Sequence, residues 1–353
     1  MKKVITMNLW YNLSKNKINM LLENFGIKEY RELLPITSGT ANKNYIIKGC
    51  KGVYGAYIGD LVLRIRSLKY SSELQMLFEE EYLRHVYSNG ISVPVPLRSK
   101  NGQCWHNIDG NTYQICPFIT GGEFDCNNDN DVAEGGAFLG RLHSAVYDLV
   151  PINERYLPRY DDPDVIIDVI YKTIDKNCSK ITEEERKTLE YIIEQTILIK
   201  ENVPDHLYNH LPKLIIHGDY HPANVKYAKG KICGLFDFDW ISRQPRIRDV
   251  ADGIIYFSSR RNENIIGDNI FSLTSGYSMD LNRIRIFLHD YNESVNFPLT
   301  PEEKKCIPYL ICARLIHSRV QALSKIPEEQ DVKMLTYGME EILNWVNNNR
   351  GKV

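Results

Sequence analysis

The feature that most constrains the fold of this chain is a change of hydrophobic periodicity near residue 120. Before it, short β-rich runs bounded by turn residues predict strands, and after it apolar residues recur at helical spacing. The expected strands cover residues 32–36, 44–48, 61–65 and 113–118. Helices are expected in this first part only over about 14–25 and 72–88.

Beyond Gly121 and Gly122 the pattern is mainly helical. Helices are expected over 132–146, 163–174 and 183–199 and from 246 to the end, with short strands at 214–216 and 231–236. A β-rich part followed by a mostly helical part is an α+β plan with two lobes. We therefore predict an N-terminal lobe of residues 1–118 and a C-terminal lobe of residues 119–353, joined by a hinge near Phe118–Gly122.

Composition excludes several classes of protein. With 353 residues, of which 43% are hydrophobic, the chain is long enough for two lobes and is neither disordered nor fibrous. Its formal charge of -2 gives no basic field for nucleic acid. No cysteine lies in a CxxC pair or a zinc-like cluster, and no apolar run is long enough for a membrane span or intact enough for a signal peptide. We expect a cytoplasmic protein without a nucleic-acid or membrane partner, and the oligomeric state stays open.

The stretch Leu214–Trp240 carries the most chemical information. An apolar strand ends at a loop that contains Asp219 and Asn224, and a hairpin then returns to a strand that ends at Asp237. Two carboxylates and an amide are thus expected at adjacent strand ends. Oxygen ligands of this kind suit Mg²⁺, which usually retains water and substrate phosphate among its ligands.

The segments HGDYHPAN and LFDFDW resemble the signatures of the aminoglycoside phosphotransferase, choline kinase and type II homoserine kinase group, within the protein-kinase-like superfamily. The resemblance implies a β-rich lobe that binds ATP and a larger helical lobe for catalysis and acceptor binding. It implies that Asp219 is the base or orienting carboxylate for the acceptor hydroxyl, and that Asn224 and Asp237 hold Mg²⁺ against the phosphates. Asp239 is a further candidate, for assisting the metal or orienting the loop.

Structural interpretations stand beside these roles. His, Asp and Asn in a loop commonly form turns and caps, although turn formation leaves the acidic strand end at Asp237 unexplained. We interpret His217 as a residue that holds the turn, and His143 as a packing residue. Asp249 resembles the family aspartate that caps the catalytic loop, and a plain helix N-terminal carboxylate is the alternative.

The loop SGTANKN, which lies between two expected strands, looks like the phosphate-covering loop of type II homoserine kinases. The resemblance makes Ser38, Gly39, Thr40 and Asn42 candidates for nucleotide binding, because small residues leave backbone N–H groups accessible to phosphate. An ordinary hairpin turn is the alternative.

The third expected strand reads LVLRIR, so Arg64 stands where the superfamily has a lysine, with Arg66 on the same face. An arginine keeps the charge but grips phosphate with a different geometry. Glu79 falls on the apolar face of the following helix, where a buried partner such as Arg64 would be needed. If the register differs, Glu80 or Glu81 takes this role, and a solvated acidic face is the alternative.

The segment YQICPFITGG fits the crossing between the lobes, where backbone groups near Cys116 and Phe118 would pair with adenine. The alternative is a buried strand that ends in a glycine turn.

The leading hypothesis is ATP- and Mg²⁺-dependent transfer of the γ-phosphoryl group to a homoserine-, choline- or sugar-like hydroxyl, with an aminoglycoside ranked lower. An acidic cluster could bind a cationic acceptor or be solvated loop; it comprises Asp125, Asp129, Asp131, Asp161, Asp162 and Asp164. A protein kinase is disfavoured by HGD in place of HRD and by the missing APE segment, and a hydrolase by the missing GxSxG. A catalytically silent pseudokinase-like or spore-associated protein is the alternative that Arg64 favours.

Overall fold

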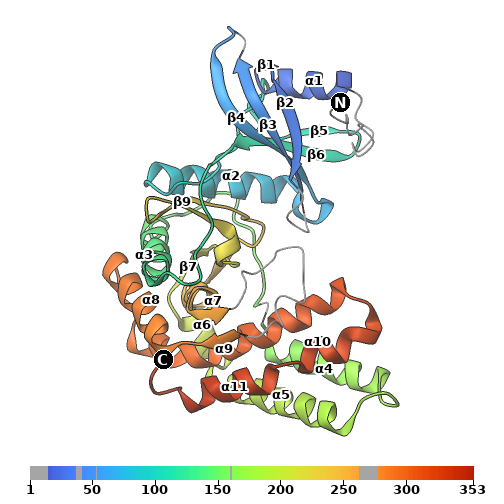
Figure 1. The fold of residues 1–353 in the computed structure, drawn as a ribbon, viewed down its shortest axis with the longest axis vertical. Coiled ribbons are helices and arrows are strands. Elements are labelled where there is room, and N and C mark those ends of the chain that lie inside the picture. Colours follow the sequence, from blue (N-terminus) through green and yellow to red (C-terminus); the bar gives the residue numbers. More distant parts are fainter. Residues whose placement is uncertain (1–14, 37–41, 53, 160, 262–276) are drawn as a thin grey trace. The chain divides into compact units, whose positions relative to one another are not determined.

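The structure is a computed structural model that describes residues 15–36, 42–52, 54–159, 161–261 and 277–353 (Figure 1). The chain forms two compact units. The front unit comprises 1–80 and 94–119, and the back unit comprises 81–93 and 120–353. In the part of the chain that is described, no helix has the length and apolar character needed to cross a membrane.

The front unit is built on a six-stranded antiparallel sheet. Its strands are β1 (Ile27–Glu29), β2 (Glu32–Ile36), β3 (Lys43–Gly52), β4 (Tyr57–Arg66), β5 (His106–Ile108) and β6 (Asn111–Pro117). The order is β1-β3-β4-β6-β5, and β2 also pairs with β3. Helix α1 (Lys15–Asn24) precedes the sheet, and α2 (Glu73–Ser88) follows β4.

Alternation along β4 separates a core face from a charged face. Leu61, Leu63 and Ile65 are buried in one apolar cluster with residues of α1, β3 and β6. Because successive side chains of a strand point to opposite faces, Arg64 and Arg66 lie on the other face. The sheet thus presents two guanidinium groups on the side away from its main core.

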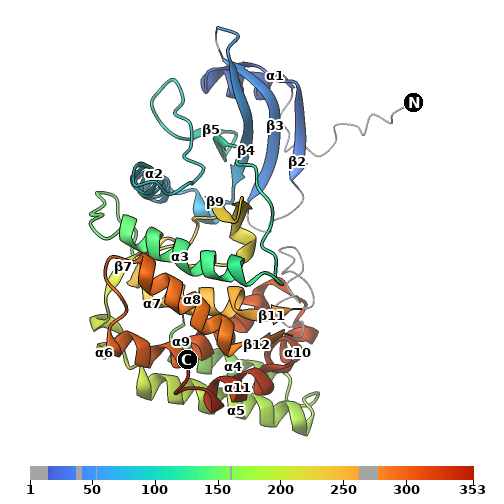
Figure 2. The ribbon, with the colours of Figure 1, turned by 60° about the vertical axis from the view of Figure 1, so that its left-hand side comes forward.

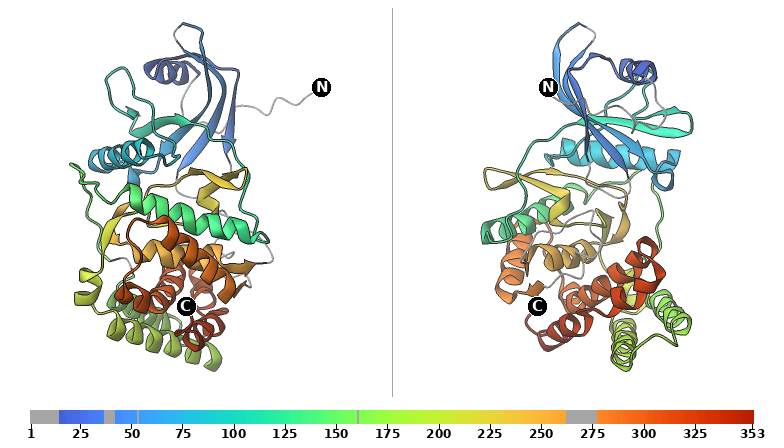
Figure 3. Two further views of the ribbon diagram at one scale, coloured as in Figure 1. Left: turned by 90° about the vertical axis from the view of Figure 1, so that its left-hand side faces the viewer. Right: turned by 45° about the vertical axis from the view of Figure 1, so that its right-hand side comes forward.

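The back unit is mainly helical. Its helices are α3 (Asp129–Ala145), α4 (Pro163–Lys176), α5 (Glu183–Asn202), α6 (Asp205–His210), α7 (Ile247–Phe257), α8 (Leu281–Ser294), α9 (Pro301–Ala322), α10 (Asp331–Thr336) and α11 (Met339–Asn348). Figure 2 shows α3 lying along α8, and Figure 3 shows these helices from two further sides. At this crossing a Cβ on Gly136 would lie 2.2 Å from the carbonyl oxygen of Phe287, so only glycine fits. The predicted α+β class is confirmed.

Within the described ranges of the back unit, three two-stranded ribbons interrupt the helices. Strand β7 (Lys213–Ile216) pairs with β10 (Ser242–Pro245), β8 (Val225–Ala228) with β9 (Lys231–Leu235), and β11 (Ser259–Arg261) with β12 (Tyr277–Met279). Lys229 and Gly230, both with positive φ, turn the chain between β8 and β9. Two loops follow from this arrangement: 217–224, which leaves β7, and 236–241, which leaves β9.

Candidate active site

The loop 217–224 is fixed to helix α7 through its backbone. Asp249, fully buried near the start of α7, accepts the N–H of His217 at 2.7 Å and the N–H of Gly218 at 2.8 Å. Two charge-assisted bonds to consecutive amides hold the beginning of the loop in one conformation. Asp249 therefore caps the loop, and the plain helix-terminal interpretation is wrong. The interpretation of His143 as a packing residue is confirmed, since its fully buried ring stacks edge-on against Tyr291 and bonds its hydroxyl at 2.9 Å.

His217 connects this loop to the one after β9. Its ring is fully buried, with Nε2 2.9 Å from the carbonyl oxygen of Phe236 and Nδ1 accepting the N–H of Asp219 at 3.3 Å. These two bonds require a proton on Nε2 and a lone pair on Nδ1. The predicted structural role of His217 is confirmed.

Gly218 lets the two loops approach closely. Its φ of +79° lies in the left-handed region, and an added Cβ would stand 2.6 Å from the carbonyl oxygen of Trp240. A side chain here would be strained and would also push the loops apart. The glycine of HGD is thus required by the contact between loops 217–224 and 236–241.

Asp219 lies between the guanidinium group of Arg314 and the imidazole of His221. Its Oδ1 accepts from Nη2 of Arg314 at 2.9 Å, and its Oδ2 lies 3.4 Å from Nε2 of His221. Burial opposes ionisation of Asp219, but the charges of His221 and Arg314 outweigh it and hold the pKa of this carboxyl well below its usual range. About a quarter of the side chain stays exposed, so an ionised carboxylate is accessible from solvent.

Asn224 and Asp237 are brought together by the pairing of the two loops. The backbone carbonyl of Asn224 accepts the N–H of Phe236 at 2.9 Å, next to Asp237. The side-chain nitrogen of Asn224 donates to the carbonyl of Asp219 at 3.0 Å, which turns its amide oxygen away from that bond. Asp237 has a φ of +63°, in the left-handed region that Asp adopts more readily than most other non-glycine residues.

These donors fit a cation that is shared with a substrate. Among the described residues, no group of three or more His, Cys, Asp or Glu could hold a metal ion. The oxygens of Asn224 and Asp237 alone would leave most positions of a Mg²⁺ ion for water and phosphate, as this ion usually requires. Asp239, nearly fully buried, follows in the same loop, and its role stays a prediction.

The charged face of the front sheet carries a buried ion pair. Both oxygens of Glu79 contact Arg66, at 2.9 Å to Nη1 and 2.8 Å to Nη2, and both side chains are buried. Arg66 also donates to the carbonyl of Tyr70 at 2.8 and 3.2 Å. Arg64 lies farther from Glu79, at 3.7 Å, and keeps 15% of its side chain exposed.

The partner expected for Glu79 was Arg64, and the structure places Arg66 in that role. The reason is position, because Arg66 ends β4 where the chain turns into α2, close to both Tyr70 and Glu79. The solvated-face alternative is wrong for Glu79, and also for Glu80, which is buried and paired with Arg98 at 2.8 Å. Arg64 keeps part of its side chain exposed on this face.

Part of the predicted phosphate loop cannot be placed, since Ser38, Gly39 and Thr40 lie outside the described residues. Asn42 is described, and its Oδ1 accepts the N–H of Ser67 at 2.9 Å, which ties the start of β3 to the end of β4. Its predicted role in nucleotide binding stays a prediction.

The backbone near Cys116 and Phe118, expected to contact adenine, belongs partly to the sheet, and its role with adenine stays a prediction. Cys116 pairs with Val62 in the ladder, and the N–H of Phe118 donates to the carbonyl of Asp60 at 3.1 Å. The N–H of Phe118 is therefore already bonded within the sheet and is not available to adenine. Backbone groups of alternate residues point the other way, as Ile115 shows by accepting the N–H of Leu97 at 2.8 Å.

Two neighbours of Asp219 were missed by the sequence analysis. Arg314 lies on α9, 95 residues farther along the chain and outside every motif. His221 stands within HGDYHPAN and was assigned no role, although its spacing of two residues from Asp219 was a usable signal.

The acidic cluster has local partners instead of a common target. Asp129 pairs with Arg283, Asp161 with Arg159, and Asp164 with Lys200. Asp162 caps α4, and the remaining two members accept backbone N–H groups in the loop before α3. These contacts give the cluster local partners, and the buried Asp131 and Asp161 do not lie in the solvated loop that was the alternative.

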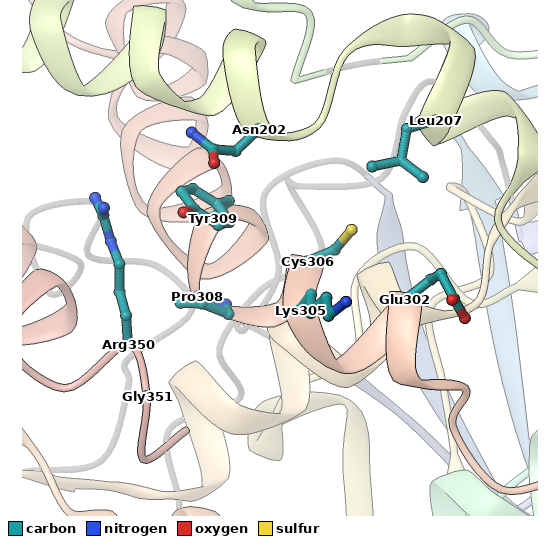
Figure 4. Close-up of a pocket in the computed structure, with 9 residues that line it drawn as sticks. All are labelled: Asn202, Leu207, Glu302, Lys305, Cys306, Pro308, Tyr309, Arg350 and Gly351. Atoms are coloured by element: carbon teal, nitrogen blue, oxygen red, sulfur yellow. The ribbon is translucent and has the colours of Figure 1, made fainter.

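A pocket of about 480 Å³ opens elsewhere in the back unit (Figure 4). Its lining comes from the end of α5, from α6, from the first half of α9 and from the C-terminal end. The side chains of Leu207, Cys306, Tyr309 and Arg350 are among those that surround it. None of the predicted site residues is among its lining residues.

Comparison with known proteins identifies relatives of this chain. A model described as the phosphotransferase enzyme family matches residues 32–277. A homoserine kinase from Neisseria meningitidis serogroup B is 24% identical over 302 residues, which covers 86% of this chain and 86% of the relative.

Solved structures share the fold at low identity. An aminoglycoside phosphotransferase from Alicyclobacillus acidocaldarius superposes with a TM-score of 0.62 at 10% identity, covering 95% of this chain and 96% of that one. The amicoumacin kinase hAmiN, in complex with AMP-PNP, Ca²⁺ and Ami, gives a TM-score of 0.61 at 14% identity, covering 95% and 93%. The predicted resemblance and the predicted two-lobed fold are confirmed.

Proposed function

Because the chain belongs to the phosphotransferase enzyme family, we propose that it is an ATP- and Mg²⁺-dependent kinase that phosphorylates a hydroxyl group of a small metabolite. The observation that carries the proposal is the catalytic loop. An ionised, partly exposed Asp219 shares that loop with Asn224, whose backbone pairs with the residue before Asp237. Turn formation alone leaves the ionised, partly exposed carboxylate of Asp219 unexplained.

In the proposed reaction Asp219 acts on the acceptor hydroxyl. Its carboxylate accepts a hydrogen bond from the hydroxyl and takes the proton as the oxygen attacks the γ-phosphorus. The bond between the γ-phosphorus and the bridging oxygen breaks, so a phosphate ester and ADP are formed. Since the low pKa makes Asp219 a weak base, its main contribution is to orient the hydroxyl, with proton transfer late in the step.

Asn224 and Asp237 are the proposed metal ligands, with Asp239 as a candidate for assistance or for orienting the loop. When bound, Mg²⁺ would offset the negative charge of the β- and γ-phosphates. The donor set supports this assignment, because it supplies few protein oxygens and leaves positions for phosphate.

The front unit is proposed to bind the nucleotide. Arg64, partly exposed beside a buried ion pair, is the proposed phosphate cation. The pair of Arg66 and Glu79 joins β4, which carries Arg64, to α2. The loop with Ser38, Gly39, Thr40 and Asn42 is proposed to cover the phosphates. For adenine, the backbone groups of Pro117 and Ile119, which alternate with the committed N–H of Phe118, replace those first expected.

Homoserine is the first candidate for the acceptor, because the curated relative of nearly equal length is a homoserine kinase. Choline-like and sugar-like alcohols follow. Aminoglycosides rank lower, because the likeness to aminoglycoside phosphotransferases, at 10% identity, supports the fold alone.

The test is acceptor-dependent release of ADP. Purified protein is incubated with Mg·ATP and, in turn, homoserine, choline, a hexosamine and an aminoglycoside. We expect turnover with homoserine and a loss of about 10³-fold or more in Asp219→Asn, since an amide cannot take the proton and is a weaker hydrogen-bond acceptor for orienting the hydroxyl. The matched control is Asp168→Asn, an exposed carboxylate of α4 paired with Lys172, which should keep full activity. Binding of Mg·ATP without turnover on any acceptor would support the catalytically silent alternative instead.

A further inference from the structure

An arginine of helix α9 contacts the loop that contains Asp219. Arg314 lies in the second half of this helix with only 9% of its side chain exposed. Its Nη2 is 2.9 Å from Oδ1 of Asp219, and its Nε is 2.8 Å from Oδ1 of Asp252 on α7. One planar guanidinium group thus bridges the proposed catalytic carboxylate and a second, buried carboxylate.

Helix α7 holds the catalytic loop in two ways. Asp249 and Asp252 are three residues apart and therefore lie on one face of the helix. Asp249 accepts the backbone amides of His217 and Gly218, whereas Asp252, 1% exposed, contacts Arg314. The first contact fixes the backbone of the loop. The second fixes the cation that contacts the side chain of Asp219.

The guanidinium group of Arg314 is charged, and its contacts fix its orientation. Burial opposes the charge of Arg314, but Asp252, Tyr256 and Asp219 outweigh it and raise the pKa of the guanidinium. The Tyr256 ring lies 5.8 Å below the guanidinium carbon. A planar guanidinium group has little freedom to rotate when two carboxylates contact different nitrogens of it.

We propose that Arg314 is a positioning residue for Asp219, and that Asp252 anchors Arg314 in this role. The inference rests on the proposed kinase function. By holding Oδ1, Arg314 fixes the plane of the Asp219 carboxylate and leaves Oδ2, whose neighbour His221 is 3.4 Å away, to face the acceptor hydroxyl. Arg314 itself contacts neither the hydroxyl nor the transferring phosphoryl group in this account.

A second ion pair also joins α7 to α9, and it disfavours a purely structural role for Arg314. Arg246, directly before α7, contacts both oxygens of Glu303 in the first turn of α9, each at 2.8 Å. The two helices are therefore already joined by a buried bidentate pair. What distinguishes Arg314 is its contact with Asp219.

The test compares kinetics of Arg314→Ala, Arg314→Lys and Asp252→Asn with those of the control Arg246→Lys. A misplaced carboxylate should lower kcat by about 10²-fold in Arg314→Ala, with KM for ATP nearly unchanged. Added guanidinium ion should restore part of kcat in Arg314→Ala. Arg314→Lys should retain intermediate activity, Asp252→Asn should lose less, and Arg246→Lys should lose thermal stability while keeping its kcat.

A crystal structure of Arg314→Ala, or of Arg314→Lys if the first variant does not fold, gives a readout besides activity. We expect Asp219 in a different rotamer while the loop backbone remains on Asp249. An active wild-type enzyme whose kcat is unchanged in Arg314→Ala, or an unmoved Asp219, would overturn this inference alone. A wild-type protein without transferase activity would overturn the proposed function together with it.

Discussion

The two arginines of β4 lead to a quantitative prediction. Replacing Arg66 by alanine should destabilise the front unit, whereas replacing Arg64 should mainly weaken nucleotide binding. The two residues share a strand and a face, so each variant is the matched control of the other. They differ in burial and contacts, because Arg66 is fully buried against Glu79 while Arg64 is 3.7 Å from it and partly exposed.

The magnitude follows from the contacts that each change removes. Arg66→Ala leaves the buried carboxylate of Glu79 without its closest cation and the carbonyl of Tyr70 without two donors. Breaking a buried pair from one side costs about 3–5 kcal/mol. Arg64→Ala leaves the closer pair of Arg66 and Glu79 in place and should therefore destabilise the protein less than Arg66→Ala.

The assay is urea unfolding followed by far-ultraviolet circular dichroism, combined with calorimetric titration of Mg·ATP. We expect a large fall of the unfolding midpoint for Arg66→Ala. For Arg64→Ala we expect a smaller fall of the midpoint and a Kd for ATP raised about tenfold or more, which corresponds to about 1.4 kcal/mol. A larger stability loss in Arg64→Ala than in Arg66→Ala would refute the assignment of the ion pair.

Three further predictions follow from the back unit. Asp249→Ala leaves the amides of His217 and Gly218 without acceptors and should cost about 2–5 kcal/mol in a denaturant titration, whereas Asp249→Asn, which keeps one oxygen, should cost less. Burial, followed by the charges of Arg314 and Arg248, lowers the pKa of His317 to about 3. The folded pKa of His317 lies below its unfolded value of about 6.5, so the unfolded chain binds a proton at a pH where the folded protein does not. The free energy of unfolding should therefore fall by about 1.4 kcal/mol per pH unit as the pH drops below about 6.5. In His317→Gln this fall should be absent, so the stability profile should be flatter between about pH 4 and 6.5. Gly136→Ala places a Cβ 2.2 Å from the carbonyl oxygen of Phe287 and should lower the free energy of unfolding by about 1–3 kcal/mol or more, whereas Gly351→Ala, with open space around it, should have almost no effect.

The sequence predicted the fold of the loop around Asp219 well, because the residues that form it are close in the chain. Asp219, Asn224 and Asp237 lie within one stretch of strand, loop and hairpin, so local rules placed them at neighbouring strand ends. The bonds of His217 and Asp249 were likewise predictable, because they satisfy the backbone of that loop. The alternation of β4 also predicted the shared face of Arg64 and Arg66.

Which arginine pairs with Glu79 could not be predicted, because periodicity gives the face of a side chain and not its reach. The contact between Arg314 and Asp219 spans 95 residues and depends on how α9 packs on α7. No local pattern encodes such a contact. The strands β1 and β5 were missed for a different reason, since three residues are too few to show alternation.

The central claim is that this protein transfers the γ-phosphoryl group of ATP to a small-molecule hydroxyl with the help of Asp219. The most direct measurement is ³¹P nuclear magnetic resonance of wild-type protein and Asp219→Asn with Mg·ATP and homoserine. The account predicts a new phosphate monoester signal that grows as the γ-phosphate signal decays, only in the wild type. Its growth at equal rates in both proteins, or the release of inorganic phosphate alone, would contradict the account.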